Sequence, residues 1–216
     1  ETDLETMNIV GMLPGSDPEL RDEYILVGGH ADHIGNMGSM TFWGANDNAS
    51  GPATVLEIAR TLAAQETAPA RSIVFMGFTG EEMGLKGAKY YAEHPMVPLE
   101  KTRLMINLDM VGAGRKGIMI VGGKNYPELL ETYRTVSKAT VDWEIAERWT
   151  VANSDHWPFQ EKNIPAIFLY AFDGPPTYHT INDKPETLDP VTMSTVGSLT
   201  ARVVMQLAEQ DDLDLR

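Results

Sequence analysis

Histidine and carboxylate residues recur along this sequence, most of them just past a stretch with the pattern of a β-strand. In chain order they are His30 and Asp32 in GGHADHIG, Asp47 in GANDNASG, Glu81 and Glu82 in FTGEEMGLKG, Asp109 in NLDMVG, and His179 in PPTYHTIND, where Tyr178 precedes it. The chain has no cysteine, and imidazole and carboxylate groups are the donors of a nitrogen and oxygen zinc site. Two metal ions about 3.5–4 Å apart can share a bridging carboxylate in hydrolytic enzymes.

The adjacent pair Glu81 and Glu82 places two like charges between Gly80 and Gly84. By itself such a pair indicates a solvated turn, just as His30 alone would be a structural histidine and Asp47 a helix cap. Beside a cation, however, one glutamate can bind the metal and the other can take a proton from a water whose pKa zinc lowers toward about 7. The order of the motifs and their shared position after strands favour the second interpretation.

Strand-like and helix-like segments alternate along the chain, and this alternation is typical of an α/β domain. Strands are predicted at 7–13, 24–28, 72–78, 103–109, 117–123 and 165–171, with an extended segment at 141–149; helices are predicted at 52–65, 84–93 and 127–139 and from Asp189 and Pro190 onward. For the helix at 52–65 we expect Ser50 as N-cap and an apolar stripe that includes Leu56 and Leu62. Ligands of open α/β sheets bind at the carboxyl ends of the strands, where these motifs fall.

The amino-acid composition of the chain argues against some classes of binding partner. The net charge is −14, which argues against binding nucleic acid through its phosphates. No apolar stretch approaches the roughly 20 residues that a membrane span needs, and without cysteine there are no disulfides or thiolate metal sites. The chain begins at Glu1 without a leader-like segment, and we expect a mature or excised catalytic domain of a secreted or periplasmic protein.

Six motifs in order, GGHADH, GANDNASG, FTGEEMGLKG, NLDMVG, SDHWPF and YHTIND, resemble the M28 family of zinc aminopeptidases, over residues from about 8 to about 207. The resemblance implies a single three-layer α/β domain over residues 1–216, with a mixed, mostly parallel sheet flanked by helices. It implies two zinc ions per chain and an exopeptidase that hydrolyses the first peptide bond of peptides with a free N-terminus. The oligomeric state and the side-chain preference are not implied.

The resemblance also implies roles for the metal-binding residues. His30 and Asp109 would bind one zinc, Glu82 and His179 would bind the second, and Asp47 would bridge the two. The same family likeness implies a cis peptide bond between Asp47 and Asn48.

Three further residues receive catalytic roles from the resemblance. Glu81 would be the general base, activating the water between the metals and passing its proton to the leaving amine. Asp32 would orient the His30 imidazole, as carboxylates behind metal ligands commonly do. Tyr178 would donate a hydrogen bond to the oxyanion of the tetrahedral intermediate.

Other polar and aromatic residues are interpreted as structural. We expect His33 to be a surface or loop histidine and His94 to be a surface histidine. We expect the SDH segment at 154–156 to line the site, with Asp155 ranked below the ligands. The apolar side chains of loop 34–44 and of the later motifs could form a substrate pocket, but ordinary packing is favoured for them: Met37, Met40, Phe42, Trp43, Trp157, Phe159, Tyr170 and Phe172.

Three alternatives to an aminopeptidase follow from the same sequence. A carboxypeptidase-type member would share the metal ligands and differ in its substrate pocket. A glutaminyl cyclase would use one zinc and typically has Trp before the last histidine, where this chain has Tyr178. A receptor-like scaffold would have lost its ligands, whereas all five predicted ligand positions and the base are filled here.

Overall fold

The computed structural model describes residues 5–215, so residues 1–4 and 216 of the predicted domain lie outside the described residues. Its strands are β1 (Ile9–Leu13), β2 (Tyr24–His30), β3 (Gly35–Met37), β4 (Met40–Phe42), β5 (Ser72–Phe78), β6 (Thr102–Leu108), β7 (Gly117–Val121), β8 (Glu144–Arg148) and β9 (Ala166–Phe172). Its α-helices are α1 (Ser50–Ala63), α2 (Lys86–Glu93), α3 (Pro127–Thr140), α4 (Trp157–Glu161) and α5 (Pro190–Ala208).

Seven of the strands form one mixed sheet in the order β1-β5-β2-β6-β9-β7-β8. The four central strands β5, β2, β6 and β9 run parallel to one another. β1 joins one edge antiparallel to β5, and β7 joins the other side antiparallel to β9. The carboxyl ends of the four central strands therefore meet at one edge of the sheet, where a ligand crevice is expected.

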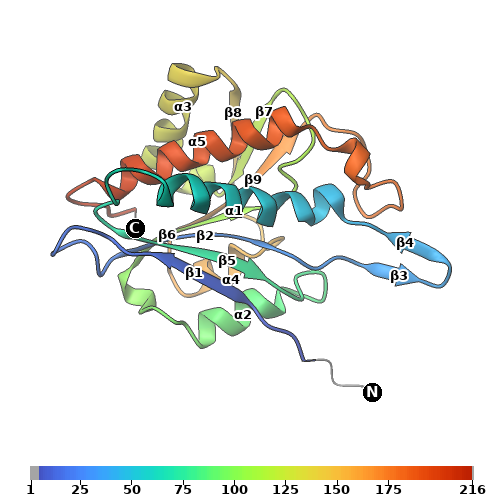
Figure 1. The fold of residues 1–216 in the computed structure, drawn as a ribbon, viewed down its shortest axis with the longest axis horizontal. Coiled ribbons are helices and arrows are strands. Elements are labelled where there is room, and N and C mark those ends of the chain that lie inside the picture. Colours follow the sequence, from blue (N-terminus) through green and yellow to red (C-terminus); the bar gives the residue numbers. More distant parts are fainter. Residues whose placement is uncertain (1–4, 216) are drawn as a thin grey trace.

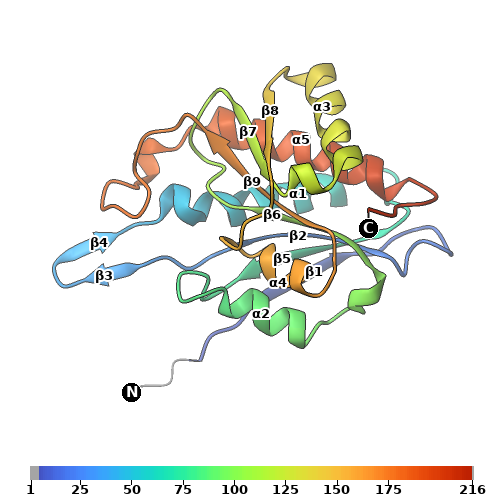
Figure 2. The same cartoon turned by 180° about the vertical axis from the view of Figure 1, so that it is seen from behind.

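Helices cover both faces of this sheet, which gives three layers (Figures 1 and 2). One core cluster joins α1, α3 and α5 to the sheet, and a second joins α2 and α4 to the opposite face. Strand β2 supplies both, because Ile25 and Val27 point into the first cluster and Leu26 into the second. Strands that are buried on both faces have continuous apolar sequences, and the sequence YILVG at the start of β2 has this pattern. The predicted fold class is confirmed.

Local sequence signals predict most helix and strand boundaries to within a few residues of those in the structure. The α5 helix begins where Asp189 accepts a hydrogen bond from the Val191 amide, and Val196, Leu199, Val203 and Leu207 are buried on one face, as the sequence predicts. Helix caps of this type satisfy amide groups that have no partner in the first turn.

Helix α1 corrects two expectations. Ser50 is its first helical residue and not its N-cap, because the Ser50 hydroxyl instead donates to the Asn46 carbonyl oxygen at 2.7 Å. The buried face carries Val55, Ile58 and Leu62, whereas Leu56 is 71% exposed. The predicted stripe was wrong at Leu56 because apolar residues on a helix also occur on the solvent side, and only the packed face reveals which set is buried.

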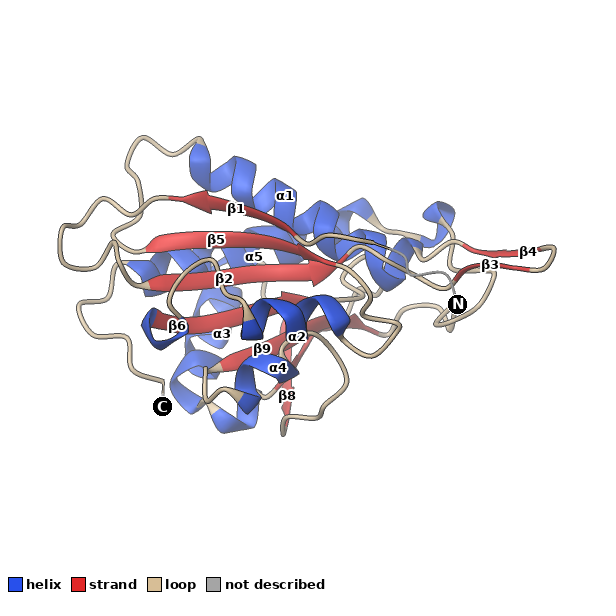
Figure 3. Ribbon diagram, turned by 90° about the horizontal axis from the view of Figure 1, so that it is seen from below, coloured by secondary structure: helices blue, strands red, loops and turns tan. Residues whose placement is uncertain are grey.

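Two elements were not predicted. Strands β3 and β4 form a separate two-stranded ribbon that extends away from the body (Figures 1 and 3). The five-residue helix α4 is too short for its periodicity to be visible in the sequence. Among residues 5–215, no helix combines the length and the apolar character that crossing a membrane requires.

Candidate metal centre

The predicted site residues converge at the carboxyl edge of the central strands. His30 is the last residue of β2, Asp109 directly follows β6, and the glutamate pair Glu81 and Glu82 lies three residues past the end of β5. His179 lies in the loop after β9, and the turn at Ala45–Ala49 that precedes α1 supplies Asp47. Segments distant in sequence meet here because parallel strands all point their carboxyl ends to one side.

Asp47 stands between two histidines. The His30 Nε2 atom lies 3.5 Å from Asp47 Oδ1 and 3.4 Å from Asp109 Oδ1. On the other side, the His179 Nε2 atom lies 3.2 Å from Asp47 Oδ2 and 3.1 Å from Glu82 Oε2. Each oxygen of Asp47 thus faces a different set of one histidine and one further carboxylate, which is the arrangement that two ions sharing a bridging carboxylate need.

The two glutamates diverge from a tight turn. Gly80 and Gly84 have positive φ angles of 67° and 97°, a conformation that glycine adopts without steric penalty. Glu82 faces His179, whereas a carboxylate oxygen of Glu81 lies within 4.8 Å of the ligand atoms of His30 and Asp109. The turn therefore directs the two like charges toward different parts of the site.

Asp32 holds this turn in place. Its two carboxylate oxygens accept the backbone N–H groups of Glu81 and Glu82 at 3.1 and 3.3 Å. The His30 Nδ1 atom lies 3.1 Å from the backbone carbonyl oxygen of Asp32 and 3.7 Å from its carboxylate. Asp32 thus contacts both a predicted ligand and the predicted base, and its carboxylate serves the glutamate turn more closely than the imidazole.

The turn that carries Asp47 is supported from the far end of the sequence. The buried Asp183 carboxylate accepts hydrogen bonds from the backbone N–H groups of Asn46 and Asp47 at 2.8 and 2.9 Å. The side chain of Asn48 donates to the carbonyl oxygen of Leu108, the last residue of β6, at 3.0 Å. The peptide bond between Asp47 and Asn48 is cis, which confirms that expectation. The sequence showed Asp183 only as the last letter of YHTIND.

His33 corrects an expectation. It lies in a loop, but its side chain is only 7% exposed, and its Nδ1 atom lies 2.9 Å from Glu82 Oε1. With Asp47 and Glu82 it forms a group whose ligand atoms are mutually within 4.8 Å. Of the expected surface or loop position, the loop is confirmed. The surface position is wrong, because the turn at Gly44 packs directly over the His33 ring. By contrast, His94 is exposed at the end of α2, as predicted.

The SDH segment lies directly behind the predicted ligand Asp109. The Ser154 hydroxyl donates to Asp109 Oδ2 at 2.7 Å and accepts from the Asn107 side chain. Burial raises the pKa of Asp155 well above its usual range, and its carboxylate accepts no hydrogen bond from residues 5–215. Burial lowers the pKa of His156 to about 4, which keeps its ring neutral. Ser154 therefore orients a predicted ligand, a role that the sequence left open.

Electrostatics and unsatisfied oxygens make the site suitable for cations. Burial, reinforced by the nearby carboxylates of Asp109 and Glu82, raises the pKa of Glu81 to about 7. Burial alone would lower the pKa of His30, but hydrogen bonding to the surrounding aspartates raises it. Three buried oxygens, Asp47 Oδ2, Glu82 Oε1 and Asp109 Oδ1, accept no hydrogen bond from the described residues. Buried anionic oxygens without partners are costly, and zinc ions fit both their chemistry and that of the histidines.

A cleft of about 460 Å³ opens beside these residues. Its walls include Tyr170, Phe172 and Tyr178, so these aromatic residues do more than fill the core. The Tyr178 ring stacks on His179 with centroids 3.9 Å apart, and the residue is 58% exposed. The ribbon residues Met37, Met40 and Trp43 are at least half exposed, so the packing expected for them is wrong.

All eight predicted site residues therefore lie in one connected group, and their individual roles stay predictions. The fold and the donor set are of the kind found in metal-dependent hydrolases of the α/β zinc-peptidase class. The family profile of peptidase family M28 matches residues 8–204. The chain belongs to peptidase family M28.

Known proteins with similar sequences or folds include aminopeptidases and a glutaminyl cyclase. Aminopeptidase YwaD of Bacillus subtilis (strain 168) is 30% identical over 181 residues, covering 78% of this chain and 38% of that protein. The aminopeptidase from Aneurinibacillus sp. strain AM-1 superimposes with a TM-score of 0.79 at 25% identity, over 97% of this chain and 50% of that one. The Bacteroides thetaiotaomicron glutaminyl cyclase bound to N-acetylhistamine has a TM-score of 0.76 at 25% identity, over 92% and 76%.

The chain spans 35% and 38% of the lengths of the first curated relatives it matches.

Proposed function

We propose that this chain is the catalytic domain of a di-zinc aminopeptidase that removes the N-terminal residue of peptides. The observation that carries the proposal is the paired arrangement about Asp47, in which each carboxylate oxygen faces a different histidine and carboxylate. One zinc would be held by His30, Asp109 and Asp47, and the other by Asp47, Glu82 and His179. His33, beside Glu82, would orient that carboxylate or join it as a ligand.

When bound, the zinc ions supply Lewis acidity that polarises the scissile carbonyl and lowers the pKa of the attacking water. Glu81 would take a proton from that water as its oxygen adds to the carbonyl carbon. Glu81 would then pass the proton to the amine nitrogen as the carbon–nitrogen bond breaks. The Tyr178 hydroxyl, on the wall of the cleft, would donate to the oxyanion of the tetrahedral intermediate. Asp32 would hold the turn that carries Glu81 in position through the two hydrogen bonds that it accepts from backbone N–H groups.

Several features favour attack at the amino end of the substrate. The cleft contains the carboxylates of Asp47, Glu81 and Asp109, which attract a protonated α-amine. Relatives that cover most of this chain carry the name aminopeptidase. Tyr178, and not Trp, precedes the last histidine, which distinguishes this chain from the pattern expected of a cyclase. We further propose that residues 1–216 form one domain and that the protein acts outside the cytoplasm.

The first experiment is a product analysis. The protein is loaded with zinc and incubated with a mixture of short unblocked peptides, and the products are read by mass spectrometry. A sample treated with chelator is the control. Stepwise loss of residues from the amino end, abolished by chelator, is the result expected of an aminopeptidase.

Other products would indicate a different enzymatic activity. Loss from the carboxyl end would indicate the carboxypeptidase type, and loss of ammonia from an N-terminal glutamine would indicate a glutaminyl cyclase. Intact peptides in the presence of stoichiometric zinc would contradict the peptidase assignment for this chain alone.

The base assignment is tested by Glu81→Gln. We expect kcat to fall by about 10²–10⁴-fold, the contribution typical of a positioned general base. Zinc content should stay the same, because the amide replaces a residue that binds no metal in this proposal. The same chemical change at the exposed Glu93, at the end of α2, is the matched control and should leave kcat unchanged. Near-normal turnover of Glu81→Gln would show that another group is the base.

A further inference from the structure

One cationic side chain stands among the carboxylates and aromatic residues of the cleft. Arg148, the last residue of β8, is the lone lysine or arginine that lines the cleft among the described residues. Its guanidinium carbon lies 5.7 Å from the centroid of the Tyr170 ring, a cation–π geometry that holds it against the cleft wall. Asp47, Glu81 and Asp109 line the same cleft.

Arg148 differs from the paired arginines of this structure because, among residues 5–215, its guanidinium has no hydrogen-bond or ion-pair partner. Arg71, Arg103 and Arg134 each form an ion pair with a glutamate, and Arg115 pairs with Asp189. The Arg148 Nε atom is buried and donates no hydrogen bond, and no carboxylate of residues 5–215 lies within ion-pair distance of its guanidinium.

A fourth acid of the cleft wall is paired with another residue. Asp173 lines the cleft, but its carboxylate pairs with Lys116 at 2.9 Å. A buried guanidinium N–H without an acceptor is unfavourable, and a planar fork of donors is suited to a carboxylate. The unpartnered Arg148 therefore points to an anionic group that arrives with the ligand of the cleft.

We propose that Arg148 binds a carboxylate of the peptide substrate and makes the enzyme selective for it. This inference rests on the proposed peptidase function, because the ligand of the cleft is taken to be a peptide. The carboxylate could come from an Asp or Glu side chain at the N-terminal residue, or from the free carboxyl terminus of a dipeptide. Both sources offer the same planar acceptor, and the peptides below separate them.

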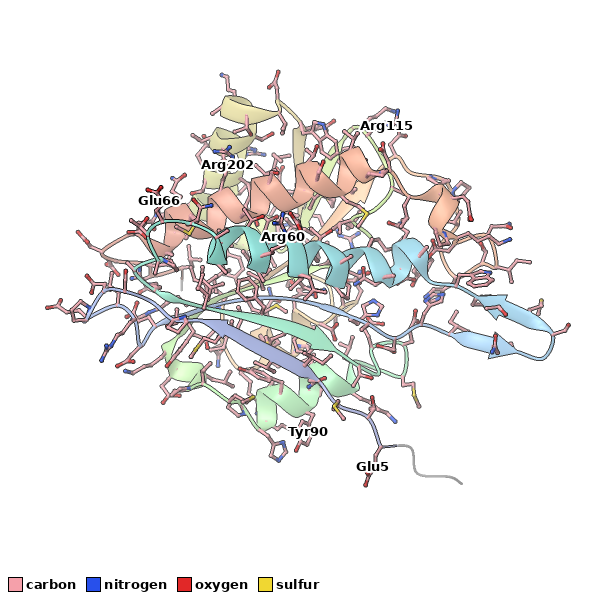
Figure 4. The ribbon with its side chains drawn as sticks, in the orientation of Figure 1. Glu5, Arg60, Glu66, Tyr90, Arg115 and Arg202 are labelled. Atoms are coloured by element: carbon pink, nitrogen blue, oxygen red, sulfur yellow. The ribbon has the colours of Figure 1, made fainter. Side chains whose placement is uncertain are left out.

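Two matched substrate pairs measure the selectivity. Glu-Ala-Ala-Ala-amide against Gln-Ala-Ala-Ala-amide changes the charge of the first side chain alone. Leu-Gly against Leu-Gly-amide changes the charge of the carboxyl terminus alone. The ratio of kcat/KM within each pair is compared for the zinc-loaded wild type, Arg148→Gln and Arg148→Lys. The control is Arg202→Gln, which removes an exposed arginine that projects from α5 (Figure 4).

We expect one of the two ratios to favour the charged peptide in the wild type and to fall by about tenfold or more in Arg148→Gln, since hydrogen bonds between charged groups are the stronger ones. Arg148→Lys should restore part of that ratio, because it keeps the charge and loses the fork. Arg202→Gln should leave both ratios as in the wild type. The inference is overturned if both ratios in Arg148→Gln equal those of the wild type.

Failure of the inference and failure of the proposed function have different signatures. Cleavage of the neutral peptides with unchanged ratios would refute the role of Arg148 and leave the peptidase intact. If none of the peptides is cleaved, titration calorimetry with L-glutamate and L-glutamine, which contain no peptide bond, decides the inference. A fall in the affinity for either amino acid in Arg148→Gln would support the carboxylate site, and affinities for both that equal those of the wild type would refute it. Thermal melts of each variant confirm that it is folded.

Discussion

At the scale of single residues, the site holds several carboxylates close together by directing them toward different partners. Glu81 and Glu82 leave their turn in different directions, and the amides of both are held by one acceptor, Asp32. The two oxygens of Asp47 are likewise divided between His30 and His179. The carboxylates thereby face different histidines, so that like charges do not converge on one position.

His33 is the residue for which the structure departs most from the expectation based on the sequence. We expect His33→Ala to weaken the affinity for zinc by about 10- to 100-fold, the loss that follows when a group behind a metal ligand is removed. The physical reason is its position 2.9 Å from Glu82 Oε1, which it would orient. Competition with a chromogenic chelator measures the affinity.

The exposed His94 provides the matched control, since His94→Ala removes an imidazole at the end of α2. Equal zinc affinities for His33→Ala, His94→Ala and the wild type would exclude His33 from the metal centre.

At the scale of elements, the turn at Ala45–Ala49 depends on the loop that follows β9. We expect Asp183→Ala to lower the free energy of unfolding by about 2–4 kcal/mol, because it leaves two buried N–H groups without acceptors. Urea denaturation measures the loss. Asp17→Ala is a matched control, since Asp17 also accepts two backbone N–H groups, but in a surface turn where water can replace it. A loss at Asp183 no larger than that at Asp17 would contradict this account.

The amino ends of three strands are held together by a partly buried cluster of charged residues. Glu23, just before β2, pairs with Arg71 before β5 at 2.8 Å and with Arg103 on β6. Arg71 is 1% exposed and also donates to carbonyl groups of the carboxyl-terminal segment, among them that of Ala208. The cluster therefore fixes the strand ends opposite the metal centre.

This cluster predicts a dependence of stability on pH. Hydrogen bonding to Arg103, and then to Arg71, lowers the pKa of Glu23 below its ordinary value of 4.5. The folded state thus binds this proton more weakly than the unfolded state, so the stabilisation is complete above about pH 4.5 and is lost as pH falls through the lowered pKa. We expect Glu23→Gln to cost about 2 kcal/mol at pH 7 and progressively less below pH 4.5. Urea melts at several pH values test this, and a pH-independent difference would contradict it.

At the scale of the whole molecule, one edge of the sheet collects ligands from most of the chain. The candidate metal centre joins β2, the turn before α1 and the turn after β5 to the residues that follow β6 and β9, from His30 to His179. Ions bound there would connect these segments in the folded state alone. The metal should therefore contribute to global stability as well as to chemistry.

We expect zinc at about 100 times its dissociation constant to stabilise the chelator-treated protein by about 2.7 kcal/mol per site, or roughly 5–10 °C in Tm for a chain of this size. Differential scanning calorimetry with and without zinc measures the shift. Asp47→Ala removes the shared ligand and should abolish most of it. A Tm that is the same with and without zinc in the wild type would argue against a metal centre that spans these elements.

Much of this protein is determined locally, by residue type and periodicity. The run SIVFMGF is apolar after its first residue because β5 is buried over nearly its whole length, and its predicted bounds agree with the structure. The α5 helix is equally predictable from the sequence, since Asp189 and Pro190 mark its start and its apolar residues recur at helical spacing. The six motifs likewise identified the family and the residues of the candidate site, because their residue types and order are visible without a fold.

The tertiary structure alone decided which distant groups meet. Asp183 supports Asp47 from 136 residues away, His33 turns inward beneath Gly44, and Arg148 enters the cleft from a strand at the edge of the sheet. Local pattern cannot predict these contacts, because they follow from strand order and from the packing of loops that share no periodicity. The sequence thus determined the donors and the elements that carry them, and the fold determined the distances and partners that turn those donors into one centre.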